Sequence, residues 1–404
     1  MELKIEKLVY GGDGLARLPA NERGRGKAVF IPFVLEGEQV DAEIIEEKPG
    51  FARARLQRVV EPSPHRTDPR CPYFTQCGGC HYQHSSYDHQ LDIKASILKE
   101  NLRRIAKLEL RSEIRVHPSP AWNYRNRTRF RVQASPEFAL GYYRFGSHAL
   151  LPIEECKISS PLINRAIRSL WEVGRAGKIA ESVLEIELFT NADDSQLLVE
   201  VYVDPQEASS DRNQVWADTL RGALPEFAGV ALFPAAPREV ASKSEAKPIV
   251  VSGSGELVYR TALAAYRVSA GSFFQINRHL TDELLQIVTA TRSGLTALDL
   301  YAGVGLFSAV LSREFERVIA VESSQQSAAD LAYNVPANAK AVRATAEQYL
   351  TNVAGKVRPD LVVLDPPRSG LGSRVARAIA ELAPPVVTYV SCDPATLARD
   401  LVPL

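Results

Sequence analysis

The last third of the chain alternates short continuous apolar runs with longer amphipathic segments. Three of the runs, at residues 297–298, 361–364 and 386–390, each lead directly into a polar motif. The motifs are Asp-Leu-Tyr-Ala-Gly-Val-Gly at 299–305, Asp-Pro-Pro-Arg at 365–368 and Ser-Cys-Asp-Pro at 391–394. Such runs are typical of strands buried on both faces of a parallel sheet, whose ligands bind at the carboxyl ends of the strands. We therefore expect an α/β domain in which the three motifs meet at one site.

The glycine turn at 299–305 has the features of a nucleoside site. Gly303 and Gly305 allow a tight turn that a ligand can approach closely. By itself such a turn is equally consistent with an ordinary loop. Glu322, however, ends the next apolar run at the distance where a ribose hydroxyl is commonly bound. The turn lacks the third glycine of the dinucleotide fingerprint and no Walker lysine follows, which points away from NAD and ATP and towards S-adenosylmethionine.

Cys392, in the third motif, follows a strand-like run directly. A thiol in this position is either an activated nucleophile beside the nucleoside site or a buried structural cysteine. The spacing of the residues leaves both interpretations open.

The first 62 residues have the pattern of a small all-β unit. Apolar or alternating runs at 3–9, 27–34, 39–46 and 52–60 are separated by glycine-containing turns, which predicts a five-stranded barrel. Seven basic residues give the unit a basic character: Arg17, Arg23, Arg25, Lys27, Arg53, Arg55 and Arg58. They indicate either an RNA-binding surface or an ordinary solvated face.

The middle of the chain reads as a mixed α/β region. An amphipathic helix is predicted over 85–108, a hairpin from 183–190 and 196–203, and a mobile surface loop over 234–248. The segment 124–132 carries arginines at every second position, which places them on one face of a strand: Arg125, Arg127, Arg129 and Arg131. Adjacent guanidinium groups need an anionic partner, which is either RNA phosphate or the carboxylates of neighbouring strands.

Length, charge and cysteine content narrow the class of protein. A chain of 404 residues is long enough for two or three domains, and its 48 basic and 48 acidic residues balance, so net charge gives no indication of nucleic-acid binding. We expect a cytoplasmic protein, since no membrane-length apolar stretch or signal peptide is present. Five cysteines occur, at 71, 77, 80, 156 and 392. The first three suit zinc or an iron–sulfur centre, with His81 and His84 as an alternative means of completing a zinc site.

Four motifs in this order resemble the RNA uracil-5-methyltransferase family: Ser-Phe-Phe-Gln-Ile-Asn at 272–277, the glycine turn, Asp-Pro-Pro-Arg-Ser-Gly-Leu at 365–371 and Ser-Cys-Asp-Pro-Ala-Thr-Leu-Ala-Arg-Asp-Leu at 391–401. Residues 1–62 resemble the TRAM domain, an RNA-binding OB-like barrel. The resemblance implies an α/β fold in which a central mixed domain, 63–270, carries a [4Fe–4S] cluster. A Rossmann-like class I methyltransferase domain, 271–404, binds S-adenosylmethionine.

The resemblance also implies residue roles. The cluster ligands are Cys71, Cys77, Cys80 and Cys156, and the cofactor contacts are Gln275, Tyr301, Glu322 and Asp365 beside the glycine turn. Phe273 contacts the base, and the Cys392 thiolate adds to C6 of uracil so that C5 can take the methyl group, with Asp365 helping to position the base. The expected partner is RNA, ribosomal more than transfer RNA, bound by a monomer.

One departure from the family concerns the end of the chain. Family members continue into further strands that carry a glutamate in a His-x-Glu-like motif, which serves as the general base, and no residue before Leu404 matches it. We therefore expect adduct formation with poor turnover. A non-catalytic RNA-binding iron–sulfur protein is the second hypothesis. A methyltransferase for another base or a protein amide is the third, and Cys392 argues against it because such methylation needs no thiol.

Overall fold

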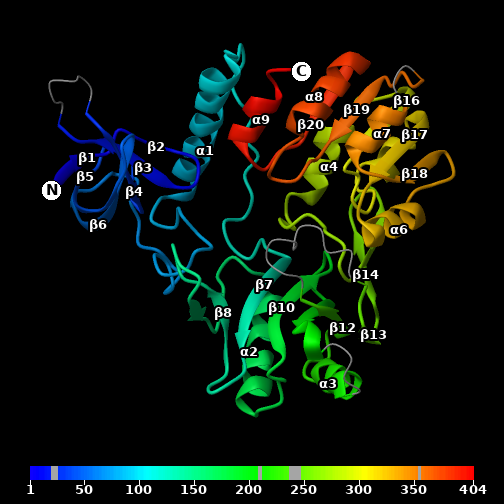
Figure 1. Cartoon of the computed structure of the whole chain (residues 1–404), viewed down its shortest axis with the longest axis horizontal. Helices are drawn as coiled ribbons and strands as arrows, with labels where there is room; N and C mark the ends of the chain where they lie inside the picture. Colours follow the sequence, from blue (N-terminus) through cyan, green and yellow to red (C-terminus); the bar gives the residue numbers. More distant parts are fainter. Residues whose placement is uncertain (20–25, 208–211, 236–246, 354–355) are drawn as a thin grey trace. The chain divides into compact units, whose positions relative to one another are not determined.

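The computed structural model describes residues 1–19, 26–207, 212–235, 247–353 and 356–404 (Figure 1). The chain forms two compact units. Unit 1 comprises Met1–Pro118, Tyr143–Leu151 and Pro394–Arg399, and unit 2 comprises Ser119–Tyr142, Pro152–Asp393 and Asp400–Leu404. Within the described part of the chain, no helix is both long and apolar enough to span a bilayer.

The amino-terminal segment of unit 1 is one six-stranded sheet in the order β1-β5-β6-β4-β3-β2. Its strands are β1 (Glu2–Lys4), β2 (Lys7–Leu8), β3 (Asp13–Arg17), β4 (Ala28–Pro32), β5 (Gln39–Glu47) and β6 (Phe51–Glu61). The expected five strands become six because the first apolar run divides into β1 and β2, while β3 begins inside the glycine stretch 11–14 and pairs with β4. Alternate residues such as Val29 and Ile31 are fully buried and form the core of the sheet.

The helix expected over 85–108 is shorter than predicted. It comprises α1 (Tyr87–Asn101) and a π-helical turn, η1 (Leu102–Ala106), which ends at Lys107 in the left-handed conformation. Ile93 and Ile97 pack against Leu8 of the sheet. Ile105, within the π-helical turn, is 40% exposed.

Unit 2 contains most of a seven-stranded sheet in the order β13-β12-β11-β10-β7-β8-β9. Its strands are β7 (Arg127–Gln133), β8 (Ala139–Tyr143), β9 (Leu150–Pro152), β10 (Val183–Thr190), β11 (Leu197–Val203), β12 (Phe227–Pro234) and β13 (Val250–Gly253). The predicted hairpin is confirmed as β10 and β11, which pair antiparallel. The helices of this region are α2 (Pro161–Arg175), η2 (Pro205–Glu207) and α3 (Arg212–Arg221). Most of the loop predicted over 234–248 lies outside the described residues.

A two-stranded ribbon leads from this sheet into the last part of unit 2. It consists of β14 (Glu256–Arg260) and β15 (Ala265–Ser269), which pair antiparallel. A loop that contains the motif 272–277 follows, and α4 (Thr281–Thr289) comes next.

The carboxy-terminal part is a five-stranded, fully parallel sheet in the order β18-β17-β16-β19-β20. Its strands are β16 (Gly294–Leu300), β17 (Phe315–Glu322), β18 (Ala339–Arg343), β19 (Leu361–Leu364) and β20 (Val386–Tyr389). Its helices are α5 (Ser308–Leu311), α6 (Gln325–Asn334), α7 (Ala346–Val353), α8 (Gly372–Leu382) and α9 (Pro394–Asp400). The three apolar runs are thus strands of one parallel sheet, as predicted.

Helices cover both faces of this sheet. Apolar residues of α7 and α8 pack on one face with Leu300 and Leu364, and residues of α4 and α5 pack on the other with Ala297 and Val363. The chain runs outward from β16 to β18, returns past β16 and continues through β19 to β20. The order of strands therefore reverses between β16 and β19, and this is where sheets of this type bind their ligands.

Candidate active site at the carboxyl edge of the parallel sheet

Three predicted cofactor residues lie at the ends of neighbouring strands. Leu300 and Leu364 are paired in register, so Tyr301 and Asp365 leave β16 and β19 side by side. Glu322 is the last residue of β17, the neighbour of β16 on the other side. The structure thus brings these side chains to one edge of the sheet, at the point where the strand order reverses.

Glu322 accepts two hydrogen bonds, one of which fixes the backbone of the glycine turn. The Gly303 N–H donates to Glu322 Oε2 at 2.9 Å, and the Ser324 N–H donates to Oε1 at 2.7 Å. Gly303 has a φ of +56°, and a Cβ added there would meet no atom within 4 Å, so its backbone faces open space. Gly305 has a φ of +96°, and a Cβ there would lie 2.9 Å from Leu331 Cδ1. Gly305 thus allows α6 to pack closely, whereas Gly303 leaves room for a ligand.

Asp299, at the end of β16, is a functional candidate to which the sequence analysis assigned no separate role. Its side chain is fully buried, Ser308 Oγ donates to its Oδ2 at 2.5 Å, and its Oδ1 accepts no hydrogen bond from any described residue. Burial raises the pKa of Asp299 to about 7, and the charges of Asp365 and Glu322 add to the increase. In the sequence, a buried functional role for Asp299 is indicated only by its position as a carboxylate near the end of an otherwise apolar strand.

Asp365 is hydrogen-bonded to Gln275, a residue of the loop between β15 and α4 that is not part of the parallel sheet. Gln275 Nε2 donates to Asp365 Oδ2 at 3.0 Å, and burial raises the pKa of Asp365 to about 6 although this hydrogen bond opposes the change. Gln275 is the fourth predicted cofactor residue, and the structure places it within hydrogen-bond distance of Asp365, another of the four. Next to it, Phe274 is buried against Tyr259, whereas the predicted base contact Phe273 is 56% exposed.

Cys392 lies three residues beyond β20 and is exposed to solvent. Ser391 Oγ accepts a hydrogen bond from the Asp393 N–H at 3.2 Å, which shapes the turn around the cysteine. The neighbouring Val390 N–H donates to the Leu364 carbonyl at 2.7 Å, so this segment follows β19 towards Asp365. The alternative of a buried structural cysteine is therefore wrong.

The arginine strand has carboxylate partners, which is the second of the two alternatives that its sequence allows; RNA binding by the partly exposed Arg129 and Arg131 stays a prediction. Arg127 is 8% exposed and pairs with Glu187 and with Glu200 at 2.9 Å. The remaining pairs on this face are Arg129 with Glu185 and Glu187, and Arg131 with Glu185 at 3.0 Å. The carboxylates come from β10 and β11, the next strands of the sheet. The glutamates were visible in the sequence, but only the pairing of the strands shows that they face these arginines.

Electrostatics keep the buried arginine charged. Burial alone lowers the pKa of Arg127, but its attraction to Glu187 and Glu200 outweighs burial and raises the pKa above its ordinary range. Arg127 is therefore a structural residue. Arg125 precedes β7, and its backbone bridges to Ser159 and Asn277, so RNA binding by Arg125 remains a prediction.

The four cysteines predicted to bind a cluster belong to different units. Cys71, Cys77 and Cys80 lie in unit 1 and Cys156 in unit 2, and all four are half-buried. The Gly79 N–H donates to Cys77 Sγ at 3.4 Å, a contact that stabilises a thiolate. Among the residues that the structure describes, no group of three or more His, Cys, Asp or Glu side chains is arranged to hold a metal ion.

The alternative zinc site, completed by histidines, is not favoured. His84 is buried with its Nε2 at 3.2 Å from the Val34 carbonyl, and burial lowers its pKa to about 4. That ring nitrogen is thus engaged by the carbonyl of Val34, which lies between β4 and β5.

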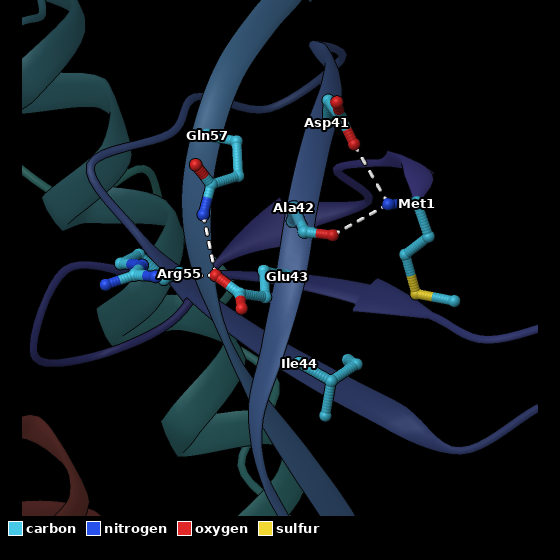
Figure 2. A pocket seen from close by; sticks show the side chains of 7 residues that line it. All are labelled: Met1, Asp41, Ala42, Glu43, Ile44, Arg55 and Gln57. Carbon is cyan, nitrogen blue, oxygen red and sulfur yellow. Dashed lines mark hydrogen bonds and ion pairs between the residues drawn. The ribbon is translucent and has the colours of Figure 1, made fainter.

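A shallow pocket on the six-stranded sheet is separate from these residues. Figure 2 shows that Glu43 accepts hydrogen bonds from Arg55 at 2.6 Å and Gln57 at 2.8 Å, while the amino terminus bonds to Asp41 at 2.9 Å. The charged groups that line it are thus paired with one another. Two of the seven basic residues noted in this region, Arg23 and Arg25, lie outside the described residues.

A parallel sheet whose first strand ends in a glycine turn, with a carboxylate after the second strand, defines a nucleoside-binding α/β domain. Comparison with known proteins gives its family. The family model for tRNA (uracil-5-)-methyltransferase matches residues 86–404, and the TRAM domain model matches residues 1–56. The chain therefore belongs to the tRNA (uracil-5-)-methyltransferase family and carries an amino-terminal TRAM domain.

Relatives and a solved structure agree with this assignment. An uncharacterized RNA methyltransferase from Aquifex aeolicus is 32% identical over 408 residues, which cover 99% of this chain and 91% of the relative. One from Halalkalibacterium halodurans is 30% identical over 424 residues, with 99% and 90% covered. The Pyrococcus abyssi tRNA (uracil-54, C5)-methyltransferase, solved with S-adenosyl-L-homocysteine, shares the fold with a TM-score of 0.75 at 23% identity, over 99% of this chain and 92% of that one. The expected class of enzyme and the expected fold are confirmed.

Proposed function

We propose that this enzyme methylates C5 of uridine in RNA through a covalent bond between Cys392 Sγ and C6 of the uracil. The observation that carries the proposal is the exposed thiol of Cys392 at the sheet edge where Asp365, Tyr301 and Glu322 also lie. A thiol nucleophile is needed for methylation at a carbon that is itself a poor nucleophile, and it has no use in methylation of an exocyclic nitrogen.

The residues at this edge fit S-adenosylmethionine. The open space at Gly303 and the fixed turn leave room for the adenosine part, and Glu322 keeps acceptor capacity for the ribose hydroxyls because each of its oxygens has two lone pairs. Asp299 and Asp365 are carboxyl groups at this edge, and their negative charge would favour binding of a cationic sulfonium group. When bound, S-adenosylmethionine supplies the methyl group as an electrophile. Tyr301 and Gln275 complete the proposed contacts.

The chemistry then follows from the substrate. The Cys392 thiolate adds to C6 of uracil and the electron pair of the C5–C6 double bond moves to C5, which attacks the methyl carbon and releases neutral S-adenosylhomocysteine. Loss of the C5 proton to a base and β-elimination of the thiolate restore the double bond and give 5-methyluracil. Asp365, held by Gln275 and with a pKa of about 6, helps to position the base beside Cys392.

We propose ribosomal RNA as the substrate, with transfer RNA as the alternative. A uracil in a folded RNA must leave its stack to reach Cys392, and Phe273 offers an exposed ring on which an extruded base can stack. A TRAM domain together with four such cysteines resembles the ribosomal RNA members of the family, whereas the Pyrococcus abyssi enzyme, whose fold matches 99% of this chain, acts on transfer RNA. Transfer of a labelled methyl group to each purified RNA distinguishes the two substrates.

We also propose that Cys71, Cys77, Cys80 and Cys156 hold a [4Fe–4S] cluster with a structural role in the reducing cytoplasm. Four thiols, one of which accepts a backbone hydrogen bond, fit such a cluster chemically. Anaerobic purification followed by iron and sulfide analysis tests this, with Cys156→Ser as the variant that loses the cluster. Protein that is iron-free after anaerobic purification contradicts it.

The experiment for the catalytic proposal uses anaerobically purified protein, S-adenosylmethionine and RNA that contains 5-fluorouracil. Fluorine cannot leave as the C5 proton does, so a working nucleophile stays bonded to the RNA. We expect a denaturation-resistant RNA–protein band that is lost in Cys392→Ala and with RNA that contains ordinary uracil. Protein that binds cofactor and RNA but forms no such band instead favours the second candidate, an RNA-binding protein without methyl transfer.

A further inference from the structure

Two buried carboxylates approach the chain just before the proposed cofactor residue Gln275. They are Asp330 of α6 and Glu200 of β11, with exposures of 0% and 1%, and both contact the segment that joins β15 to Gln275. Neither residue is part of the four motifs. Buried carboxylates cost free energy unless they are fully hydrogen-bonded, so the donors that surround each of them matter for stability.

Asp330 accepts four hydrogen bonds, three from residues of β15 and one from Ser272 in the segment that follows it. Its Oδ1 accepts from Arg267 Nε at 2.8 Å and from Ser269 Oγ at 2.7 Å. Its Oδ2 accepts from the Ser269 N–H at 2.8 Å and from Ser272 Oγ at 2.7 Å. Both oxygens therefore face donors only, which an amide side chain cannot reproduce.

Glu200 holds the same segment from the central sheet. Its Oε1 accepts from the Gly271 N–H at 3.0 Å and from Arg127, and Arg127 also donates to the Ser272 carbonyl. Ser272 is thus bonded through its side chain to α6 and through its backbone to β7. Only two residues separate it from Gln275, whose own carbonyl accepts from Asn126 Nδ2 at 2.9 Å.

The same helix also holds the glycine turn. Asn334, four residues after Asp330 and so on the same side of α6, donates to the Val304 carbonyl and to the Arg267 carbonyl, each at 2.9 Å. One helix therefore ties the turn that faces the cofactor to the segment that carries Gln275.

We propose that Asp330 is a positioning residue for cofactor binding, which acts through Ser272 to place Gln275 against Asp365 before the cofactor arrives. The inference rests on the proposed function, because it takes Gln275 as a cofactor contact. A site assembled in advance spends no binding free energy on ordering its own groups. If Asp330 were only a packing residue, its loss would lower stability without acting through Gln275.

The test is a double-mutant cycle on the full chain, with S-adenosylhomocysteine as the probe in isothermal titration calorimetry. We expect Asp330→Asn and Gln275→Ala each to raise Kd about tenfold, and the double variant to be within about twofold of the weaker single variant. Glu256→Gln, which removes the other carboxylate near Arg267, is the matched control and is expected to bind as the wild type does.

Several outcomes overturn the inference. Unchanged binding of the probe by Asp330→Asn is one such outcome. A double variant whose Kd is raised about a hundredfold is another, because the two substitutions then act independently. If thermal unfolding shows that Asp330→Asn does not fold, Ser272→Ala replaces it in the cycle, because it deletes only one hydrogen bond. Ser272→Ala is expected to weaken binding of the probe, and this effect is expected to disappear when Gln275 is already replaced by alanine. A wild-type chain that binds the probe but methylates no RNA contradicts the proposed function and leaves the positioning role standing.

Discussion

Replacing Asp299 by asparagine is expected to stabilise the cofactor-free enzyme at alkaline pH. Asp299 is fully buried, and burial with two neighbouring carboxylates raises its pKa from 3.8 to about 7. A carboxyl whose pKa is higher in the folded than in the unfolded protein favours folding fully only below its unfolded pKa. That stability is lost as the pH rises through the folded pKa. The wild type therefore loses stability between about pH 4 and about pH 7 through this one group, and asparagine, which has no charge to bury, does not.

The size of the effect follows from the shift. A change of about three pKa units corresponds to about 4 kcal/mol of unfolding free energy, at about 1.4 kcal/mol per unit. Asparagine can keep the hydrogen bond from Ser308, but its amide nitrogen takes the place of Oδ1, which has no partner among the described residues. An unsatisfied buried amide costs about 1–3 kcal/mol, so the net gain of Asp299→Asn at about pH 8 is about 1–3 kcal/mol. At about pH 5 the wild-type carboxyl is already protonated, and the gain disappears.

The assay is urea denaturation of both proteins, without cofactor, at a series of pH values from about 5 to about 8.5. We expect the two stability curves to diverge as the pH rises, with the variant above the wild type at the alkaline end. Asp365 is present in both proteins, and its charge acts on Asp299 only in the wild type, which adds to the divergence of the curves as the pH rises. Parallel curves, with the variant less stable throughout, would refute the reasoning, because Asp299 would then not be held in a destabilised charged state.

Four further substitutions test the site and the residues that support it. Gly305→Ala is expected to lower the free energy of unfolding by about 1–3 kcal/mol, because the added Cβ would lie 2.9 Å from Leu331 Cδ1. The Cβ added by Gly303→Ala would have no atom within 4 Å, so this substitution is expected to cost only about 1 kcal/mol. Urea denaturation measures both. Glu322→Gln loses an acceptor for the Gly303 or the Ser324 N–H and is expected to weaken S-adenosylhomocysteine binding about tenfold in calorimetry; unchanged affinity contradicts its role. Arg127→Met removes the arginine partner of the buried Glu200 and one of the two arginine partners of Glu187, and it is expected to cost about 3–5 kcal/mol. A variant as stable as the wild type contradicts the structural role of Arg127.

The arginine strand shows where sequence reasoning needed the structure. Because the arginines occur at every second position, the sequence predicted that they lie on one face of a strand. Their adjacent positive charges require anionic partners on that face. Glu185 and Glu187 were visible in the sequence, in a segment predicted to be a strand. That this strand pairs with the arginine strand in register, with Glu187 opposite Arg129, depends on a non-local pairing that a single sequence does not indicate.

The positioning of Gln275 is a second case. Its role was suggested by resemblance, but the residues that hold its segment come from α6 and the central sheet. Asp330 lies 58 positions from Ser272, and Glu200 lies 71 positions from Gly271. Asp330 and Glu200 look like ordinary polar positions in the sequence, because nothing local distinguishes a buried carboxylate from an exposed one. Their burial is a property of the packed domain.

The sequence by itself determined the local parts of this protein: the short buried strands, the glycine turn, the carboxylate after the second strand and the motif order that indicates the family. These features depend on residues close together in the chain, where hydrophobic period and turn chemistry act directly. Only the tertiary structure decided which carboxylates are buried, that Arg127 pairs with glutamates, and that Cys392 is exposed. Burial and charge pairing arise from contacts between distant segments, and one residue of register decides which face a side chain occupies.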